Sequence, residues 1–274
     1  MSTNNTFSFA RLALVMKRDF MENWKTNLYR LIGPYAAILF GMWVLFMNDA
    51  GFQSFAEYIA IVFAVLLYWG SLWSASHILE SMNTQQKRIS FLMLPATSFE
   101  KFLSRFLYVT VGFVLMCTLS LLLAEATRFL IQPFFDLPDT FNQSVFSTVW
   151  WEGIHKGITF SERFSYEDFV VKGSIHFLYL VWIHSFFLLA GCCWYKHAFW
   201  RTLGLTIVVW LLIITGIVNS IHEVMLSDIL EFISESAFNF IAILVYSLLI
   251  LLNWWLSYRC FTRQQVIKPK FRLL

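Results

Sequence analysis

The segment QQKRISFLMLPATSFEKFLSR, residues Gln85–Arg105, interrupts a strongly apolar region of the chain and carries five charged side chains. Its apolar run, FLMLP, is too short to cross a membrane. The stretches on either side, 55–76 and 106–124, approach the length needed to cross roughly 30 Å of hydrocarbon at about 1.5 Å per residue. The pattern predicts two membrane spans joined by a basic, proline-broken connector.

The composition of the whole chain supports the same interpretation. The 274 residues are 58% hydrophobic and 14% charged, whereas soluble domains average about 45–50% and about 25%. Because a soluble protein could not bury so much apolar surface, the composition predicts an integral membrane protein. The N-terminal MSTNNTFSF has no basic region before an apolar one, so we expect no signal peptide.

Six apolar stretches reach or nearly reach the length of a membrane span. None of them alternates polar and apolar residues in the roughly ten-residue units of an outer-membrane barrel, so we expect an all-α membrane protein. We expect one transmembrane domain covering 1–274. The six predicted spans are 31–47, 55–76, 106–124, 174–195, 203–221 and 237–258.

Lysine and arginine residues predict the orientation. With six spans both termini share one side, and 16 of the 20 basic residues fall on that side. The positive-inside rule then places both termini in the cytoplasm and the chain in the cell (inner or plasma) membrane. The four cysteines fall within spans or at cytoplasmic ends, so we expect no disulfide outside the cell. The net charge of +3 follows from topology and gives no case for nucleic-acid binding.

The segments outside the spans also have recognisable patterns. Residues 7–29 place apolar side chains such as Leu12, Met16, Phe20 and Trp24 four apart, which predicts an amphipathic helix at the cytoplasmic interface. Anchoring to membrane lipids and docking onto a cytoplasmic partner are both open for it. The extracytoplasmic loop 128–172 is long for a structureless connector, so we expect short surface helices within it.

The cytoplasmic connector, 77–105, contains two helix signals separated by a stop. The run ISFLMLP can form at most two helical turns, because Pro95 disfavours helix at the residue before it. Thr97 and Glu100 then match a capping box, which starts a new helix leading into the third span. We therefore expect a short helix at the cytoplasmic surface, held between two spans.

The motifs of several enzyme classes are absent from the sequence. There is no GxxxxGK[ST] phosphate loop, no GxSxG elbow and no acidic pair within a span. The sequence HEVML, which begins at His222, lacks the second histidine of a zinc protease helix. We therefore predict no catalytic, cofactor-binding or metal-ligating residues, and no enzymatic activity of this chain alone.

Polar side chains within the predicted spans are possible pathway residues, because ionisable groups in a membrane tend to face a bundle interior or a wet cavity. His176 and His184 are eight residues apart in the fourth span, hence near one face, and Asn219 lies in the fifth. Substrate passage or gating and interhelical hydrogen bonding are the two alternatives. We expect Glu57 and Glu125, near outer span ends, to be solvated at the interface.

The connector resembles the coupling helix of the permease subunits of type-2 ATP-binding-cassette (ABC) exporters. Residues 91–94 take the leucine-rich part of that pattern, Pro95 the proline, Thr97 the hydroxyl residue after it and Lys101 a basic residue entering the third span. The chain departs from the pattern upstream, where residues 88–90 read Arg-Ile-Ser instead of the usual Gly-Thr-x-Glu. The six spans after an amphipathic N-terminal helix are similar to the family's topology.

The resemblance implies a transport subunit without its own ATPase chemistry. Two permease subunits, as a homodimer or heterodimer, would form the substrate pathway, and each would dock on one of two cytoplasmic ABC ATPase subunits that bind ATP and magnesium. A membrane scaffold or sensor that binds a non-ATPase partner through the same loop is the alternative, and a stand-alone carrier is a third. The residues expected to contact the ATPase are Gln85, Gln86, Lys87, Arg88, Ile89, Ser90, Phe91, Leu92, Met93, Leu94, Pro95 and Thr97.

Overall fold

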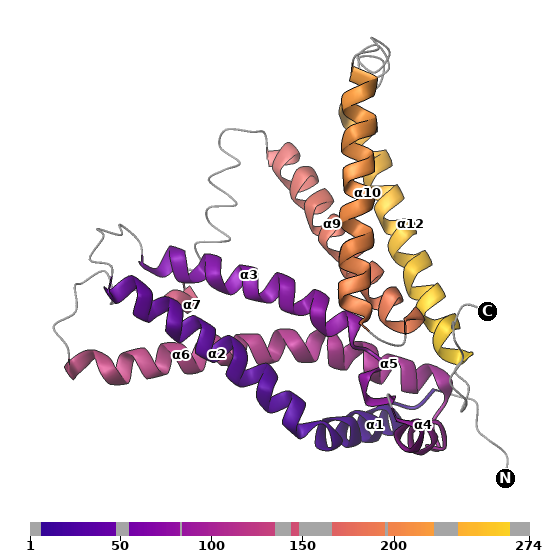
Figure 1. The fold of residues 1–274 in the computed structure, drawn as a ribbon, viewed down its shortest axis with the longest axis horizontal. Coiled ribbons are helices and arrows are strands. Elements are labelled where there is room, and N and C mark those ends of the chain that lie inside the picture. Colours follow the sequence, from indigo (N-terminus) through magenta and orange to yellow (C-terminus); the bar gives the residue numbers. More distant parts are fainter. Residues whose placement is uncertain are drawn as a thin grey trace. The chain divides into compact units, whose positions relative to one another are not determined.

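The computed structural model describes residues 7–47, 55–82, 84–134, 144–147, 166–194, 197–221 and 235–263. Within these ranges the regular structure is helical and contains no β-strand, which confirms the all-α prediction (Figure 1). The chain forms two compact units, one of Met1–Ser74 with Pro95–Phe169 and the other of Ala75–Leu94 with Val170–Leu274.

Among the described residues, five helices are long and apolar enough to cross a membrane, and five of the six predicted spans fall on them. The chain is therefore a multi-pass helical membrane protein. The remaining predicted span, 203–221, falls on helix α10 (Ala198–Ile221), whose apolar part among the described residues is Ala198–Leu212. The five candidate spans are Trp24–Met47, Tyr58–Ser76, Ser98–Phe134, Gly173–Cys193 and Asn239–Thr262.

The predicted N-terminal helix, 7–29, is divided in two. Helix α1 covers Phe9–Glu22 and α2 covers Trp24–Met47, so the spanning helix begins seven residues earlier than residue 31. The break has a local cause at Asn23, whose backbone N–H and side-chain amide both donate to the Asp19 carbonyl. Asn27 donates to the next carbonyl, that of Phe20. These bonds satisfy carbonyls at the end of α1 that have no partner within the helix.

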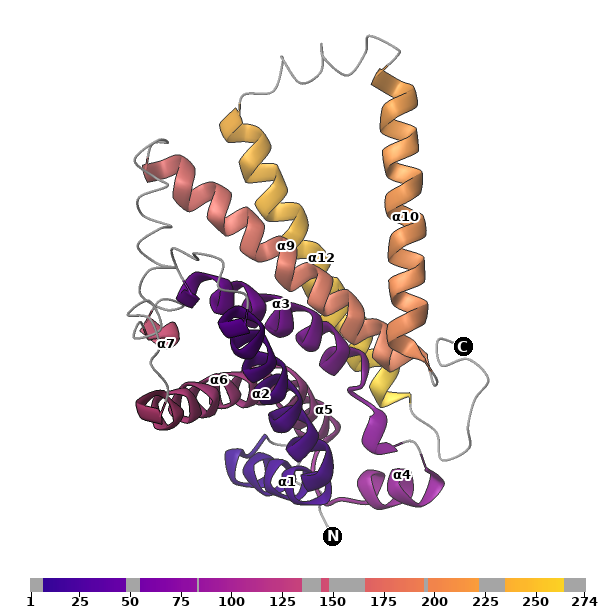
Figure 2. The same ribbon diagram turned by 60° about the vertical axis from the view of Figure 1, so that its left-hand side comes forward.

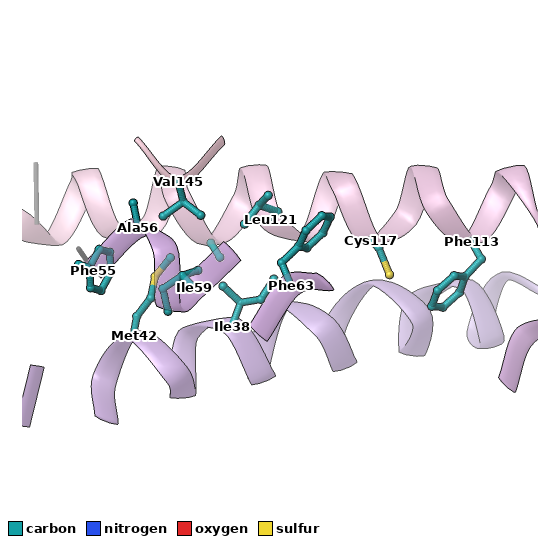
Figure 3. Packing of buried hydrophobic residues seen from close by; sticks show 11 residues of the cluster. Ile38, Met42, Phe55, Ala56, Ile59, Phe63, Phe113, Cys117, Leu121 and Val145 are labelled. Atoms are coloured by element: carbon teal, nitrogen blue, oxygen red, sulfur yellow. The ribbon is translucent and has the colours of Figure 1, made fainter. Parts of the chain in front are cut away.

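The core of the first unit lies between α2, α3 (Phe55–Ser76) and α6 (Val111–Ile131). Figure 3 shows Ile38 of α2, Phe63 of α3 and Leu121 of α6 pointing into the same space between the helices. Val145, from the short helix α7 (Val145–Ser147), closes one end of this cluster. Three spans are thus packed around one apolar centre.

Helix α5 (Ser98–Val109) leads into α6 with only Thr110 between them. The Ser74 hydroxyl of α3 donates to the Val109 carbonyl at 2.8 Å, and the Thr110 hydroxyl donates to the Phe106 carbonyl at 2.7 Å. The predicted third span, 106–124, therefore lies inside a longer helical segment. At about 1.5 Å per residue, the 37 residues of Ser98–Phe134 exceed the hydrocarbon thickness.

The second unit is built from α9 (Tyr166–Cys193), α10, α12 (Glu235–Thr262), the short 3-10 helix η1 (Glu80–Met82) and α4 (Gln85–Leu92). Helices α9 and α12 run side by side (Figure 2). Tyr179 meets Tyr246, and 67–68 residues also separate the pairs Ser185–Asn253 and Cys193–Cys260. Because both members of each pair advance together, the two helices are parallel.

Only part of the predicted loop 128–172 falls on described residues. Helix α6 extends to Ile131 and is followed by η2 (Gln132–Phe134), while α9 begins at Tyr166, eight residues before the predicted span start at 174. Together with α7, these elements supply helical structure in a region where short surface helices were expected. The rest of the loop lies outside the described residues.

Replacing Gly191 by alanine should lower the free energy of unfolding by about 1–3 kcal/mol, as overpacking does. A Cβ atom on Gly191 would lie 2.6 Å from the Ser76 carbonyl oxygen and 2.9 Å from that of Ala75, and backbone cannot move aside cheaply. Gly204→Ala is the control, because nothing lies within 4 Å of its Cβ position. Thermal unfolding of the purified protein in detergent measures both, and equal effects would contradict the packing.

Candidate functional site

Helix α4 is a short, separately capped helix, as the sequence predicts. Thr84 begins it, with its hydroxyl accepting from the Lys87 N–H at 3.3 Å. At the other end the Met93 N–H donates to the Ile89 carbonyl at 2.9 Å, two residues before Pro95. The proline stop was predicted from the sequence and the Thr84 cap was not, although Thr84 precedes the helix at the usual place for an N-cap residue.

One face of α4 is held inside the second unit. Arg88 is 1% exposed and Phe91 is 2% exposed, and their spacing of three places them on the same side of the helix. The Arg88 guanidinium donates to the Met82 carbonyl of η1 at 3.4 Å. The Phe91 ring meets the Phe261 ring of α12 edge to face, with centroids 6.3 Å apart. These two side chains anchor the helix.

The opposite side of α4 is exposed. Gln86, Ser90 and Met93 follow one another at spacings of four and three, and Met93 is 79% exposed. Of the twelve residues predicted to contact a partner, Arg88 and Phe91 are buried, and Ile89, Leu92, Leu94 and Thr97 are half-buried. Six members are exposed; Pro95 belongs to the first unit, and the five in the second unit, which we call the α4 outer face, are Gln85, Gln86, Lys87, Ser90 and Met93.

The predicted capping box at the start of α5 is confirmed. The Glu100 N–H donates to the Thr97 hydroxyl at 3.2 Å, and the Thr97 N–H donates to Glu100 Oε2 at 2.8 Å. The fully buried Glu100 carboxylate also accepts from Arg11 Nη2 at 2.9 Å and from the Ser8 N–H at 2.7 Å. One carboxylate therefore serves the first turns of both α1 and α5, where a negative charge is favourable.

A second buried acid binds α1 to α5. Asp19 accepts from Arg105 Nη2 and from the Ser104 hydroxyl, each at 2.9 Å, and both charged partners are almost fully buried. Burial raises the pKa of Asp19 above its ordinary value, although the Arg105 guanidinium and the Ser104 hydroxyl favour the carboxylate. The cost of removing two charges from water offsets much of their attraction. The pair therefore contributes more to the register of α1 against α5 than to net stability.

Further polar contacts continue along the same two helical segments. The Tyr108 hydroxyl donates to Asn27 Oδ1, the Ser120 hydroxyl donates to the Leu31 carbonyl at 2.8 Å, and the Tyr35 and Thr127 hydroxyls lie 3.0 Å apart. With Arg11–Glu100 and Asp19–Arg105 they form a series, which we call the cross-helix ladder. Both sequence positions rise from one contact to the next, so α1–α2 runs parallel to α5–α6.

The structure does not place the three predicted pathway residues in a common environment. His176 of α9 is exposed and its ring lies 6.5 Å from that of Tyr179, whereas His184 is half-buried. Asn219 lies in α10, but its side chain is outside those described. The alternative role was interhelical hydrogen bonding. Between α9 and α12 such a bond is made by Asn253, which donates to the Ser185 hydroxyl at 2.9 Å.

The expectation that Glu125 is solvated is wrong. Its side chain is buried, accepts from the Phe146 N–H at 3.3 Å and lies 3.6 Å from Arg128 Nη2. The Arg128 guanidinium in turn lies over the Phe55 ring, 5.4 Å from its centroid. A partner three residues away and a covering aromatic ring replace water at this position. The side chain of Glu57 is outside those described.

Comparison with known proteins gives no relative: no family model, no curated protein and no solved structure matches the chain. Within the described part of the chain, no three His, Cys, Asp or Glu side chains are grouped so that they could hold a metal ion. The α4 outer face and its two anchors are therefore the feature from which a function can be argued.

Removing Arg105 should destabilise the protein more than removing the whole ion pair. Arg105→Met leaves the Asp19 charge buried without its cation, and breaking a buried pair in this way costs about 3–5 kcal/mol. The double variant Asp19→Leu/Arg105→Met should recover most of that loss, because apolar replacements of both partners are often neutral. Denaturant unfolding in detergent measures the difference.

The exposed pair Arg18–Glu22 of the same helix supplies the control. Arg18→Ala should change stability by only about 0.3–0.5 kcal/mol, as for other i,i+4 pairs. If the double variant were less stable than Arg105→Met alone, the ion pair would not be the reason for the loss.

Proposed function

We propose that this chain is the membrane-spanning subunit of an ATP-driven ABC exporter and that it docks on a cytoplasmic ATPase through the α4 outer face. One observation carries the proposal: α4 is a short capped helix whose buried face is fixed by Arg88 and Phe91 while its other face is exposed. A rigid surface helix of this kind suits the transmission of a push from a partner. The resemblance of the connector to the exporter coupling helix supports the same role.

Through Arg88 and Phe91, a displacement of α4 by the partner would be transmitted to the spans of the second unit. Phe91 contacts Phe261 near the end of α12, and Arg88 contacts η1, which directly follows α3 in the chain. Displacement of α4 would therefore move both neighbours. In the proposed complex two such chains line the substrate pathway, and ATP with its magnesium is bound by the partner ATPase. The aromatic-rich spans suit an amphiphilic cargo.

The direction of the helices and the distribution of basic residues both support the proposed topology of six spans with cytoplasmic termini. Since α9 and α12 are parallel, the chain between them has to return across the membrane, and α10 is the helix available for that crossing. In the first unit α3 returns the chain in the same way between the parallel α2 and α6. The excess of basic residues supports a cytoplasmic position for α4 in this topology.

Negative charge introduced on the α4 outer face should separate the chain from its ATPase without unfolding it. We expect Lys87→Glu and Met93→Glu to abolish co-purification of an ATPase subunit from native membranes, with stability changed by no more than about 0.5 kcal/mol, as at other exposed positions. Phe91→Ala removes a buried anchor instead and should cost about 3–5 kcal/mol.

Arg263→Glu, an exposed charge reversal after the end of α12, is the matched control and should retain the partner. Unchanged ATPase capture by both α4 variants would exclude this face as the docking surface. If the wild-type chain captures a protein without ATPase activity through the same residues, the scaffold or sensor function takes the place of the exporter.

Cysteine labelling tests the crossing made by α10. In intact cells, a membrane-impermeant maleimide should label Ala237→Cys, at the start of α12, and should label Arg201→Cys, at the start of α10, only after permeabilisation. The four native cysteines are buried and should give little background. Labelling of both positions from the same side would refute the six-span topology.

A further inference from the structure

We propose that Cys193 and Cys260 form an oxidant-sensitive thiol pair, which closes to an intramolecular disulfide between the ends of α9 and α12. The two sulfur atoms lie 3.6 Å apart, on different helices and 67 residues apart in sequence. Cys193 is the last residue of α9, and Cys260 lies in the last turn of α12. The parallel register of the two helices brings the thiols together.

The geometry requires only a small movement. A disulfide has a sulfur–sulfur distance of about 2.05 Å, so each sulfur would move by somewhat less than about 1 Å from the present contact. Side-chain rotation at a helix end can supply such a shift. Cys192 and Cys117, the other two cysteines, are buried as well, and Cys117 belongs to the first unit. They serve as internal comparisons.

The chemistry needs a small oxidant, because Cys193 is 8% exposed and Cys260 is 4% exposed. A hydroperoxide first transfers one oxygen to either thiol, giving a sulfenic acid and releasing water or an alcohol. The second thiol, losing its proton, then attacks that sulfur and displaces its hydroxyl group as water, which forms the sulfur–sulfur bond. Two thiols are oxidised by two electrons and one peroxide is reduced.

The position of the pair suggests what the bond would restrain. Phe261 follows Cys260 directly and carries the ring that meets Phe91 of α4. Two residues before Cys193, Gly191 packs against the Ser76 carbonyl at the end of α3. A bond between the two cysteines would therefore stiffen the junction at which α4 is anchored. The consequence for coupling rests on the proposed function, whereas formation of the bond does not.

The test uses the full chain in native membranes treated with hydrogen peroxide. The protein is then denatured in the presence of N-ethylmaleimide, so that buried thiols are blocked as well, and the digested protein is searched by mass spectrometry for the Cys193–Cys260 linked peptide. We expect two of the four thiols to be lost, with recovery after dithiothreitol treatment. Cys192→Ala and Cys117→Ala should keep the link, and Cys193→Ser and Cys260→Ser should each abolish it.

Four free thiols after treatment, a link through Cys192, or links only between molecules would each overturn the proposal. These measurements are made on wild-type protein, so a poorly folding serine variant does not weaken them. ATPase stimulation is measured on the same membranes, and we expect peroxide to reduce it at least several-fold in wild type and not in Cys260→Ser. A link without any ATPase partner would support the thiol pair and count against the exporter function.

Discussion

The buried ion pair between Asp19 and Arg105 is the constraint on which the arrangement of the first unit depends. An uncompensated charge at that depth costs several kcal/mol, on the order of 3–5, so α1 and α5 are restricted to the one register that joins the two groups. The next contacts of the cross-helix ladder, from Asn27–Tyr108 to Tyr35–Thr127, are compatible with this same register. A slip of one residue along either helix would break the ion pair first.

Polar contacts have this influence because apolar helix faces gain little free energy by leaving lipid to pack against one another. Side chains such as Ile38 and Leu121 fill the core, but hydrocarbon would solvate them almost as well. Hydrogen bonds and close backbone approach are more selective. The second unit uses the same means with other residues, namely Ser185–Asn253 between α9 and α12 and the approach of Gly191 to the Ser76 carbonyl.

The sequence predicted features that depend on neighbouring residues. The proline stop and the Thr97–Glu100 box act within a few residues, and the spans follow from apolar length. Burial of single polar groups was not predicted, because it depends on how separate elements pack. Arg88 was expected to contact a partner, but it is buried and its guanidinium donates to the Met82 carbonyl of η1. Asp19 did carry a signal, since it continues the apolar spacing of Leu12 and Val15 and so faces α5.

Separate docking and transmitting residues would also account for the departure of this chain from the exporter pattern. At residues 88–90, where that pattern has Gly-Thr-x-Glu, the chain has an arginine whose guanidinium reaches back to the Met82 carbonyl. A long, buried side chain tied to η1 holds α4 on one side, while Phe91 holds it against α12. With both sides fixed, α4 cannot tilt without moving its neighbours. In the proposed complex, partner choice would then depend on the α4 outer face, which could change without altering how movement of α4 is transmitted.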